Sequence, residues 1–291
     1  MVYLAADGAL VCLAEVRDSA DGFDLASDGL SSDAYGRLDD TTGNMNAEEP
    51  LFKQLDLVVF DLAGTTLRIG DQIPKAFREA FREKGIMLSE REILDIRGRS
   101  KRESILVLLE KHFGLQATDM TEMVHERFLQ LLDQAFGKKE IEAITGSEET
   151  FHWLAERKLR IALNTGFERR FAMPLLERIG WIGIADVVVC GDEVPRGRPA
   201  PDLIIESMKR SGCNDASRVS VVGDTRADLE AAEKAGVRLA VGVLSGAHDE
   251  EQLKACAHDA IIPGVTDLPG LLSGTNSVIK PFFSNKKIEN T

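Results

Sequence analysis

Polar residues with reactive side chains follow two apolar runs of the sequence. Asp61 comes after the valine-rich run 55–60 and precedes a turn of small residues, while Asn164 and Thr165 end a second run and are followed by Gly166. A carboxylate at the end of a buried strand is placed to attack an electrophile or to bind a metal ion. A hydroxyl group beside glycine-permitted backbone N–H groups forms a typical anion site.

Two later loops add charged side chains. Arg198 stands just before a helical pattern, and Asp224 and Asp228 follow the apolar run 219–223. Magnesium prefers one or two carboxylates together with water and substrate phosphate oxygens, and Asp61 with Asp224 would supply the carboxylates. We therefore expect the four loops to form one site that binds an anion and a divalent cation.

The elements that must position these loops alternate between strand and helix. Short valine-rich or alternating runs predict strands, and amphipathic helical patterns separate them, which is typical of a parallel sheet covered on both faces. Right-handed crossovers bring the carboxyl ends of such strands to one edge, where α/β proteins bind ligands. The predicted fold class is an α/β, doubly wound, parallel-sheet core, with strands at 55–60, 160–165, 186–190, 219–223, 239–243 and 260–263.

A helical segment interrupts this core directly after the first strand. Residues 68–143 contain amphipathic helical patterns and no strand candidate, and Pro74 suits the start of the first helix. Two S-x-x-E sequences, at Ser89 and Ser100, predict capping boxes at later helix starts. We interpret the segment as an all-α cap domain inserted into the core.

The two ends of the chain differ from the core in composition. Residues 1–53 are rich in acidic residues, serine and glycine, a composition that favours disorder. We predict that native translation starts at Met45, so that residues 1–44 are dispensable for activity. The predicted organisation is a disordered extension at 1–53, a core at 54–67 and 144–272, a cap at 68–143 and a tail at 273–291.

Charge and composition exclude several classes of partner. The formal net charge of −13 disfavours nucleic acid, because phosphate backbones require clustered lysine and arginine. No run of 18 or more apolar residues predicts a membrane span. The four cysteines are far apart and form no CxxC pair, which favours a reducing compartment, and we expect a cytoplasmic protein.

In order and spacing, the four loops resemble those of the haloacid dehalogenase superfamily of phosphohydrolases, across roughly residues 54–270. The helical insertion resembles the C1-type cap of that superfamily. The resemblance implies that Asp61 is a nucleophile that forms an aspartyl-phosphate and that Thr165 binds the phosphoryl oxygens. It also implies Mg²⁺ held by Asp61, Asp224 and the backbone carbonyl of Ala63, with Asp228 in support.

Two departures from the family pattern point to a subgroup. Most members carry a second aspartate two residues after the nucleophile, where this chain has Ala63, and most carry a lysine where this chain has Arg198. Together the two replacements resemble phosphonoacetaldehyde hydrolase and its phosphonatase-like relatives. That subgroup cleaves a C–P bond and uses a cap lysine, which forms a Schiff base, instead of the missing acid.

Lys101 matches the position of that cap lysine, in the sequence Arg97-Gly98-Arg99-Ser100-Lys101-Arg102. Four cations near the start of a helix repel one another and the helix macrodipole, which favours anion binding and a lowered amine pKa. The pattern departs from the subgroup because Arg97 replaces a methionine and the expected nearby histidine is absent. A Schiff-base lysine, an anion-binding residue and a solvated surface charge all remain open for Lys101.

The sequence thus predicts a Mg²⁺-dependent hydrolase of a small phosphonate (phosphonoacetaldehyde-like, cleaved at its C–P bond) or phosphate ester. A phosphomutase or phosphotransferase of the same superfamily and a non-catalytic phosphate-binding module are the alternatives. The sequence does not determine the substrate or the oligomeric state, and a homodimer is one of the possible states. The expected catalytic residues are Asp61, Lys101, Thr165 and Arg198, and the expected substrate-binding residues are Gly64, Thr65, Arg97, Arg99, Asn164 and Gly166.

Overall fold

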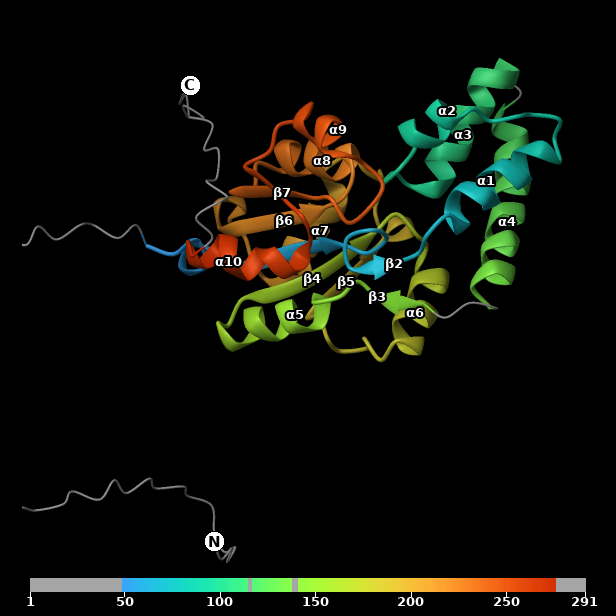
Figure 1. The fold of residues 1–291 in the computed structure, drawn as a ribbon. Helices are drawn as coiled ribbons and strands as arrows, with labels where there is room; N and C mark the ends of the chain where they lie inside the picture. Colours follow the sequence, from blue (N-terminus) through green and yellow to red (C-terminus); the bar gives the residue numbers. More distant parts are fainter. Residues whose placement is uncertain (1–48, 115–116, 138–140, 276–291) are drawn as a thin grey trace, which may run out of the picture. The chain divides into compact units, whose positions relative to one another are not determined.

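The computed structural model describes residues 49–114, 117–137 and 141–275, and its central element is a six-stranded parallel sheet (Figure 1). The strand order is β5-β4-β1-β6-β7-β8, so the first strand lies in the middle. The predicted α/β class and the positions of all six strands are confirmed. The strands are β1 (Leu57–Asp61), β4 (Arg160–Thr165), β5 (Val187–Cys190), β6 (Val219–Gly223), β7 (Leu239–Val243) and β8 (Ala260–Ile262).

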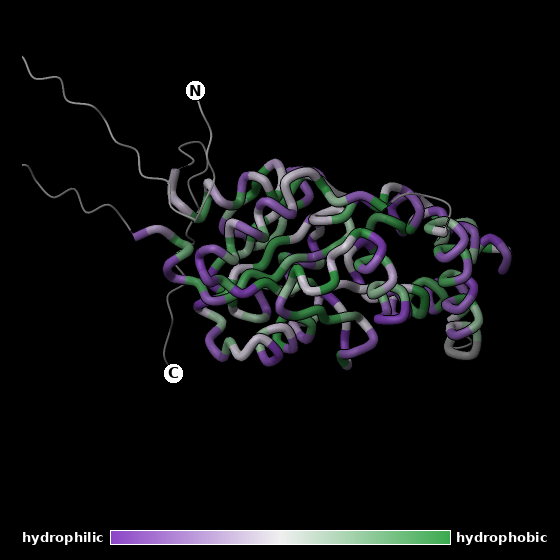
Figure 2. The backbone as a smooth tube through the Cα atoms, turned by 90° about the horizontal axis from the view of Figure 1, so that it is seen from below, coloured by the Kyte–Doolittle hydropathy of each residue, from purple (hydrophilic) through white to green (hydrophobic). Residues whose placement is uncertain are grey.

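Alternate side chains of β1 enter two separate cores, which is why this strand is apolar throughout. Val58 and Phe60 belong to one buried cluster, which includes residues of α5, α6 and α10. Leu57 and Val59 belong to the other, which includes residues of α7 and α8. The sheet is therefore doubly wound, and Figure 2 shows its apolar segments running through the interior. These helices are α5 (Ser147–Glu156), α6 (Arg169–Arg178), α7 (Asp202–Ser211), α8 (Arg226–Ala235), α9 (Glu250–Lys254) and α10 (Leu268–Ser273).

Strand register places the polar loop residues side by side. Asp61 pairs with Asn164 across β1 and β4, and Phe60 pairs with Val222 of β6. The residues that follow β4 and β6, including Gly166 and Asp224, therefore leave the sheet on either side of Asp61. This confirms the expectation that the loops share one sheet edge.

The helical insert consists of α1 (Gln72–Arg82), α2 (Glu90–Asp95), α3 (Lys101–Phe113) and α4 (Ala117–Phe136). Figure 1 shows these helices grouped beside the sheet. A two-stranded antiparallel ribbon, β2 (Leu67–Arg68) with β3 (Glu142–Ala143), joins the insert to the core. The prediction of helix throughout 68–143 was wrong at β3, because two residues are too short to show alternation. Proline at the start of α1 was also misplaced, since the helix begins two residues before Pro74.

One of the two predicted capping boxes is complete. Ser89 accepts a hydrogen bond from the backbone N–H of Glu92, whose carboxylate accepts one from the Ser89 N–H in return. Ser100 accepts from the Glu103 N–H, but the Glu103 carboxylate accepts from the Gly197 N–H of the core, 3.0 Å away. The prediction of the second capping box was therefore wrong for the bond from the Ser100 N–H to Glu103. The Gly197 N–H, from a distant part of the chain, donates to that carboxylate instead.

The described residues include only part of the predicted chain ends. A short 3₁₀ helix, Leu51–Gln54, lies across the predicted boundary at residue 53. The rest of the predicted extension, including Met45, and most of the predicted tail lie outside the described residues. Among the residues described here, no helix is both long enough and apolar enough to cross a membrane.

Candidate active site

Asp61 lies at the carboxyl end of β1 and forms a buried ion pair with Arg198. The carboxylate residue is 5% exposed and the arginine 2%, and Nη2 of Arg198 lies 2.7 Å from Oδ1 of Asp61. The same guanidinium is ion-paired with Asp228. Arg198 thus compensates two buried carboxylates, and it lies beside Asp61 as a cation with a fixed position.

Asp224 is the second acid of the site, and its carboxyl group is fully buried. It accepts hydrogen bonds from the Ala247 N–H at 2.7 Å and from the Thr65 hydroxyl at 3.3 Å. Burial, together with repulsion from Asp61, raises the pKa of Asp224 to about 7. A Cβ atom at Gly64 would lie 2.3 Å from Oδ2 of Asp224, so glycine is required at this position for the close approach. Gly64 and Thr65 therefore support Asp224.

The donor set fits a hard divalent cation. Burial and then the charge of Asp61 raise the pKa of Asp224 to about 7, and a cation between the two carboxylates would favour the charged form instead. The described residues include no cluster of three or more His, Cys, Asp or Glu side chains suited to a metal. Two carboxylates with a backbone carbonyl at Ala63 leave positions for water and phosphoryl oxygens, as Mg²⁺ prefers.

Asp228 has other partners in the structure. Besides its ion pair with Arg198, its carboxylate accepts a hydrogen bond from the Thr225 N–H at 3.1 Å and forms a capping box at the start of α8. It is not among the residues that line the pocket around Asp61. Its predicted support of a metal stays a prediction, while its contact with Arg198 is direct.

Thr165 and Gly166 line the same pocket as Asp61. The Thr165 hydroxyl accepts a hydrogen bond from the Phe167 N–H at 3.2 Å, which fixes the turn after β4. A Cβ at Gly166 would lie 2.5 Å from the carbonyl oxygen of Arg99, so the turn contacts the helical insert closely. Asn164 is buried beside Asp61 in the sheet and does not line the pocket.

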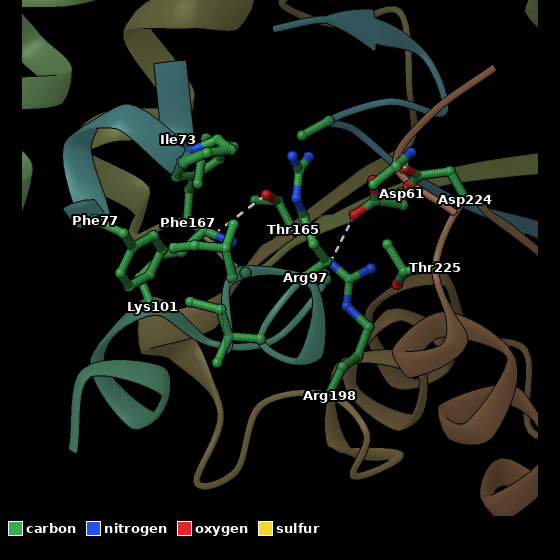
Figure 3. A pocket seen from close by; sticks show the side chains of 17 residues that line it. Asp61, Ile73, Phe77, Arg97, Lys101, Thr165, Phe167, Arg198, Asp224 and Thr225 are labelled. Atoms are coloured by element: carbon green, nitrogen blue, oxygen red, sulfur yellow. Dashed lines mark hydrogen bonds and ion pairs between the residues drawn. The ribbon is translucent and has the colours of Figure 1, made fainter. Parts of the chain in front are cut away.

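Lys101 extends from the insert into this pocket (Figure 3). It is 8% exposed, its Nζ donates to the Arg99 carbonyl oxygen at 3.2 Å, and Nζ lies 5.2 Å from the centroid of the Phe167 ring. Burial and then the positive charge of Arg198 lower the pKa of Lys101 to about 8. The interpretation as a solvated surface charge is wrong, because packing against Phe167 removes the side chain from water.

The two neighbouring arginines differ in position. Arg97 lines the pocket with Lys101 and Asp61. Arg99 lines a separate cavity of about 370 Å³ between the insert and the core, with Arg226 and His248 among its walls. The structure therefore brings Arg97, and not the Arg99 side chain, to the pocket around Asp61, although Arg97 lines the second cavity as well. Only the backbone carbonyl of Arg99 takes part, as the acceptor of the lysine.

The remaining wall of the pocket is apolar, and sequence reasoning did not find it. The enclosed space is about 40 Å³, so it admits only a small ligand without movement of the insert. The amphipathic stripe of α1 and the phenylalanine directly after Gly166 were the available signals. The apolar side chains are Ile73, Pro74, Phe77, Ile93, Ile96 and Phe167.

Comparison with known families agrees with this arrangement. Residues 58–242 match the family model described as haloacid dehalogenase-like hydrolase, which covers more than half of the chain. The chain belongs to the haloacid dehalogenase-like hydrolase family. As a member of that family it is a hydrolase, and the predicted resemblance is confirmed.

Individual relatives place this hydrolase near the phosphonatases and phosphatases of the family. It is 30% identical over 205 residues to phosphonoacetaldehyde hydrolase from Bordetella pertussis, with 66% of this chain and 74% of the relative covered. It is 30% identical to the probable phosphatase IndB from Dickeya dadantii, with 74% and 92% covered. A phosphonoacetaldehyde hydrolase-like protein from Oleispira antarctica has the same fold, with a TM-score of 0.67, 21% identity, and 80% and 96% coverage.

Proposed function

We propose that this hydrolase cleaves a small phosphonate or phosphate ester through an aspartyl-phosphate formed on Asp61, with Mg²⁺ as cofactor. The observation that carries the proposal is the convergence of Asp61, Asp224 and Arg198 in one small buried pocket at the sheet edge. A nucleophilic carboxylate needs compensation of its own charge before it can approach a phosphoryl group. Arg198, 2.7 Å from Asp61, provides part of it.

Asp61, Asp224 and the Ala63 carbonyl would hold the cation, which supplies positive charge to the phosphoryl oxygens. The Thr165 hydroxyl and the backbone N–H groups of its turn bind the phosphoryl group opposite Asp61. The helical insert acts as a cap that excludes water from the pocket while the phosphoryl group is transferred. Water then hydrolyses the aspartyl-phosphate and regenerates the Asp61 carboxylate.

Lys101 and Ala63 together favour a carbonyl-bearing phosphonate. Ala63 offers no general acid two residues after the nucleophile, and an ester leaving group would normally need one. Lys101 is a buried amine with a pKa of about 8, so a useful fraction is neutral and nucleophilic near pH 7. Its imine with the substrate carbonyl would let the C–P electron pair move into an enamine, with no proton required at the leaving carbon.

Phosphate ester hydrolysis is the second candidate, in which Lys101 binds an anionic group of the substrate. The similarity to a probable phosphatase at 30% identity favours it. The two candidates predict different behaviour of the lysine and the same behaviour of Asp61.

Borohydride trapping separates them. With phosphonoacetaldehyde present, borohydride is expected to inactivate the wild type irreversibly and to leave Lys101→Arg unmodified, as mass spectrometry of the intact protein would show. Absence of trapping in an active wild type would favour ester hydrolysis. Asp61→Asn should abolish phosphate release from every substrate, and residual turnover would refute the assignment of the nucleophile.

A further inference from the structure

Arg97 is a half-buried cation that lines the pocket, and its side chain has no bound partner among the described residues. Its Nε is inaccessible to solvent and makes no hydrogen bond, and no ion pair joins its guanidinium to a described acid. Figure 3 shows the side chain extending into the pocket that Asp61 and Thr165 also line. Charged groups withdrawn from water are normally paired, so a half-buried guanidinium without a protein partner in a ligand pocket points to an anionic group of the ligand.

The negative charge that acts most strongly on Arg97 would be neutralised when the enzyme binds its divalent cation. Asp224 is the acid whose charge acts most strongly on Arg97. Asp224 already accepts hydrogen bonds from Ala247 and Thr65 and belongs to the proposed cation site. Once a divalent cation neutralises Asp224, the other acid that acts on Arg97 is Glu90, which is exposed and ion-paired with Arg78. An oxyanion of the ligand would then supply the missing counter-charge in the pocket.

The position of Arg97 indicates which end of the ligand carries this oxyanion. The phosphoryl group is bound by residues of the core, at the ends of β1 and β4. Arg97 and Lys101 come from the insert and lie four residues apart in one loop and helix start, so they face the carbon end together. The apolar wall around them offers no partners for sugar hydroxyls, and the small volume admits a short chain. A carboxylate is the compact oxyanion that pairs with a guanidinium in two parallel hydrogen bonds.

We propose that the preferred substrate is a short 2-oxo acid with a phosphono group on carbon 3, whose carboxylate is bound by Arg97 while its keto carbon faces Lys101. This inference rests on the proposed function of the Asp61 site. It adds Arg97 as the residue that selects an acid over an aldehyde.

The chemistry balances with the groups already assigned. The Lys101 amine adds to the keto carbon and releases water, giving a protonated imine. Asp61 attacks phosphorus, the C–P bond breaks, and its electron pair moves to carbon 3 to form an enamine. The enamine takes a proton on carbon 3, and water hydrolyses the resulting imine and the aspartyl-phosphate. The products are a 2-oxo acid without phosphorus and inorganic phosphate.

Steady-state kinetics with 3-phosphonopyruvate and phosphonoacetaldehyde test the inference. The wild type is expected to prefer phosphonopyruvate in kcat/KM by about 10- to 100-fold, the usual range for a hydrogen bond to a charged group. Arg97→Met should lose this preference mainly through phosphonopyruvate, and Arg97→Lys should restore part of it. Arg91→Met, which replaces an exposed arginine of α2, is the matched control and should retain the preference. A wild type that prefers the aldehyde, or a preference unchanged in Arg97→Met, would overturn the inference.

Calorimetric binding to Asp61→Asn protein gives a readout that does not depend on turnover. The Asp61→Asn protein should bind phosphonopyruvate more tightly than phosphonoacetaldehyde, and adding Arg97→Met should remove the difference. Equal binding of the two ligands would count against the inference even in an active enzyme. Failure of the proposed function is distinguishable, since it would appear as no phosphate release from either compound by the wild type.

Discussion

The guanidinium of Arg198 joins two buried carboxylates, Asp61 at the end of β1 and Asp228 in the first turn of α8. Its Nη2 lies 2.7 Å from Oδ1 of Asp61, and the arginine is only 2% exposed. A planar guanidinium can contact two carboxylates at once, whereas a lysine ammonium is a single point charge. This geometry explains why an arginine suits the position in a chain that also has Asp228 within reach.

Replacing Arg198 should separate its contribution to folding stability from its contribution to catalysis. Arg198→Met leaves two buried acids without a counter-charge and is expected to lower stability by about 3–5 kcal/mol. It should also lower kcat by about 10²–10³-fold, as for loss of a charge-stabilising donor. Arg198→Lys keeps one positive charge, and we expect it to retain a larger share of the wild-type activity than of the wild-type stability. Urea unfolding and phosphate release measure the two effects, and a fully active Arg198→Met would contradict the assignment.

The raised pKa of Asp224 predicts a pH dependence of stability in the metal-free protein. Folding raises the pKa from 3.8 to about 7, so the native state binds more protons than the unfolded state between these values. Stability should therefore fall as pH rises from about 4 to about 7, by on the order of a few kcal/mol. Asp224→Asn should flatten this part of the profile relative to wild type.

Adding Mg²⁺ should reverse the loss of stability in wild type alone. The melting temperature at pH 8 is expected to rise with Mg²⁺ in the wild type and to stay unchanged in Asp224→Asn. Equal shifts in both proteins would place the cation elsewhere.

Arg97 should influence the reactivity of Lys101 at a distance. Its charge is one of the causes that lower the pKa of Lys101 to about 8. Borohydride trapping of a carbonyl compound on Lys101 should rise with pH and level off above about 8, because only the neutral amine reacts. In Arg97→Met the same rise should occur at higher pH. An unchanged profile would mean that burial and Arg198 set the pKa of Lys101 without a contribution from Arg97.

Contact between the insert and the core should depend on Gly166. A Cβ there would lie 2.5 Å from the Arg99 carbonyl oxygen, so Gly166→Ala must displace the insert from the turn after Thr165. We expect kcat/KM to fall about 10²-fold, because a misplacement near 1 Å has that effect on positioned groups. Gly264→Ala is the control, since its nearest neighbour would be 3.8 Å away, and it should be near wild type in activity.

The sequence predicted the strand ends and their chemistry better than the pocket as a whole. Asp61, Thr165 and Asp224 could be found because each ends or follows a local apolar run, and parallel connections force such ends together. Arg198 could be found because it precedes a helical pattern in the same alternation. The apolar wall could not be found in this way, because Ile73 and Phe77 read as ordinary core positions of an amphipathic helix. Whether such a side chain faces a ligand or another helix depends on how the insert packs.

Arg99 shows the opposite error. Charge clustering suggested that both Arg97 and Arg99 bind substrate, but nearby side chains of a turn point in different directions. Both arginines line the second cavity, but only Arg97 also lines the pocket around Asp61. The Arg99 carbonyl still holds the lysine, a backbone contribution that residue type alone does not reveal.

The diverted carboxylate of Glu103 has a mechanical consequence. It accepts from the Gly197 N–H, one residue before Arg198, and so ties the start of α3 to the loop that carries the arginine. Withdrawal of α3 would break that hydrogen bond and weaken the ion pair between Arg198 and Asp61. The same movement of α3 would then both release the product and change the contact between Arg198 and Asp61.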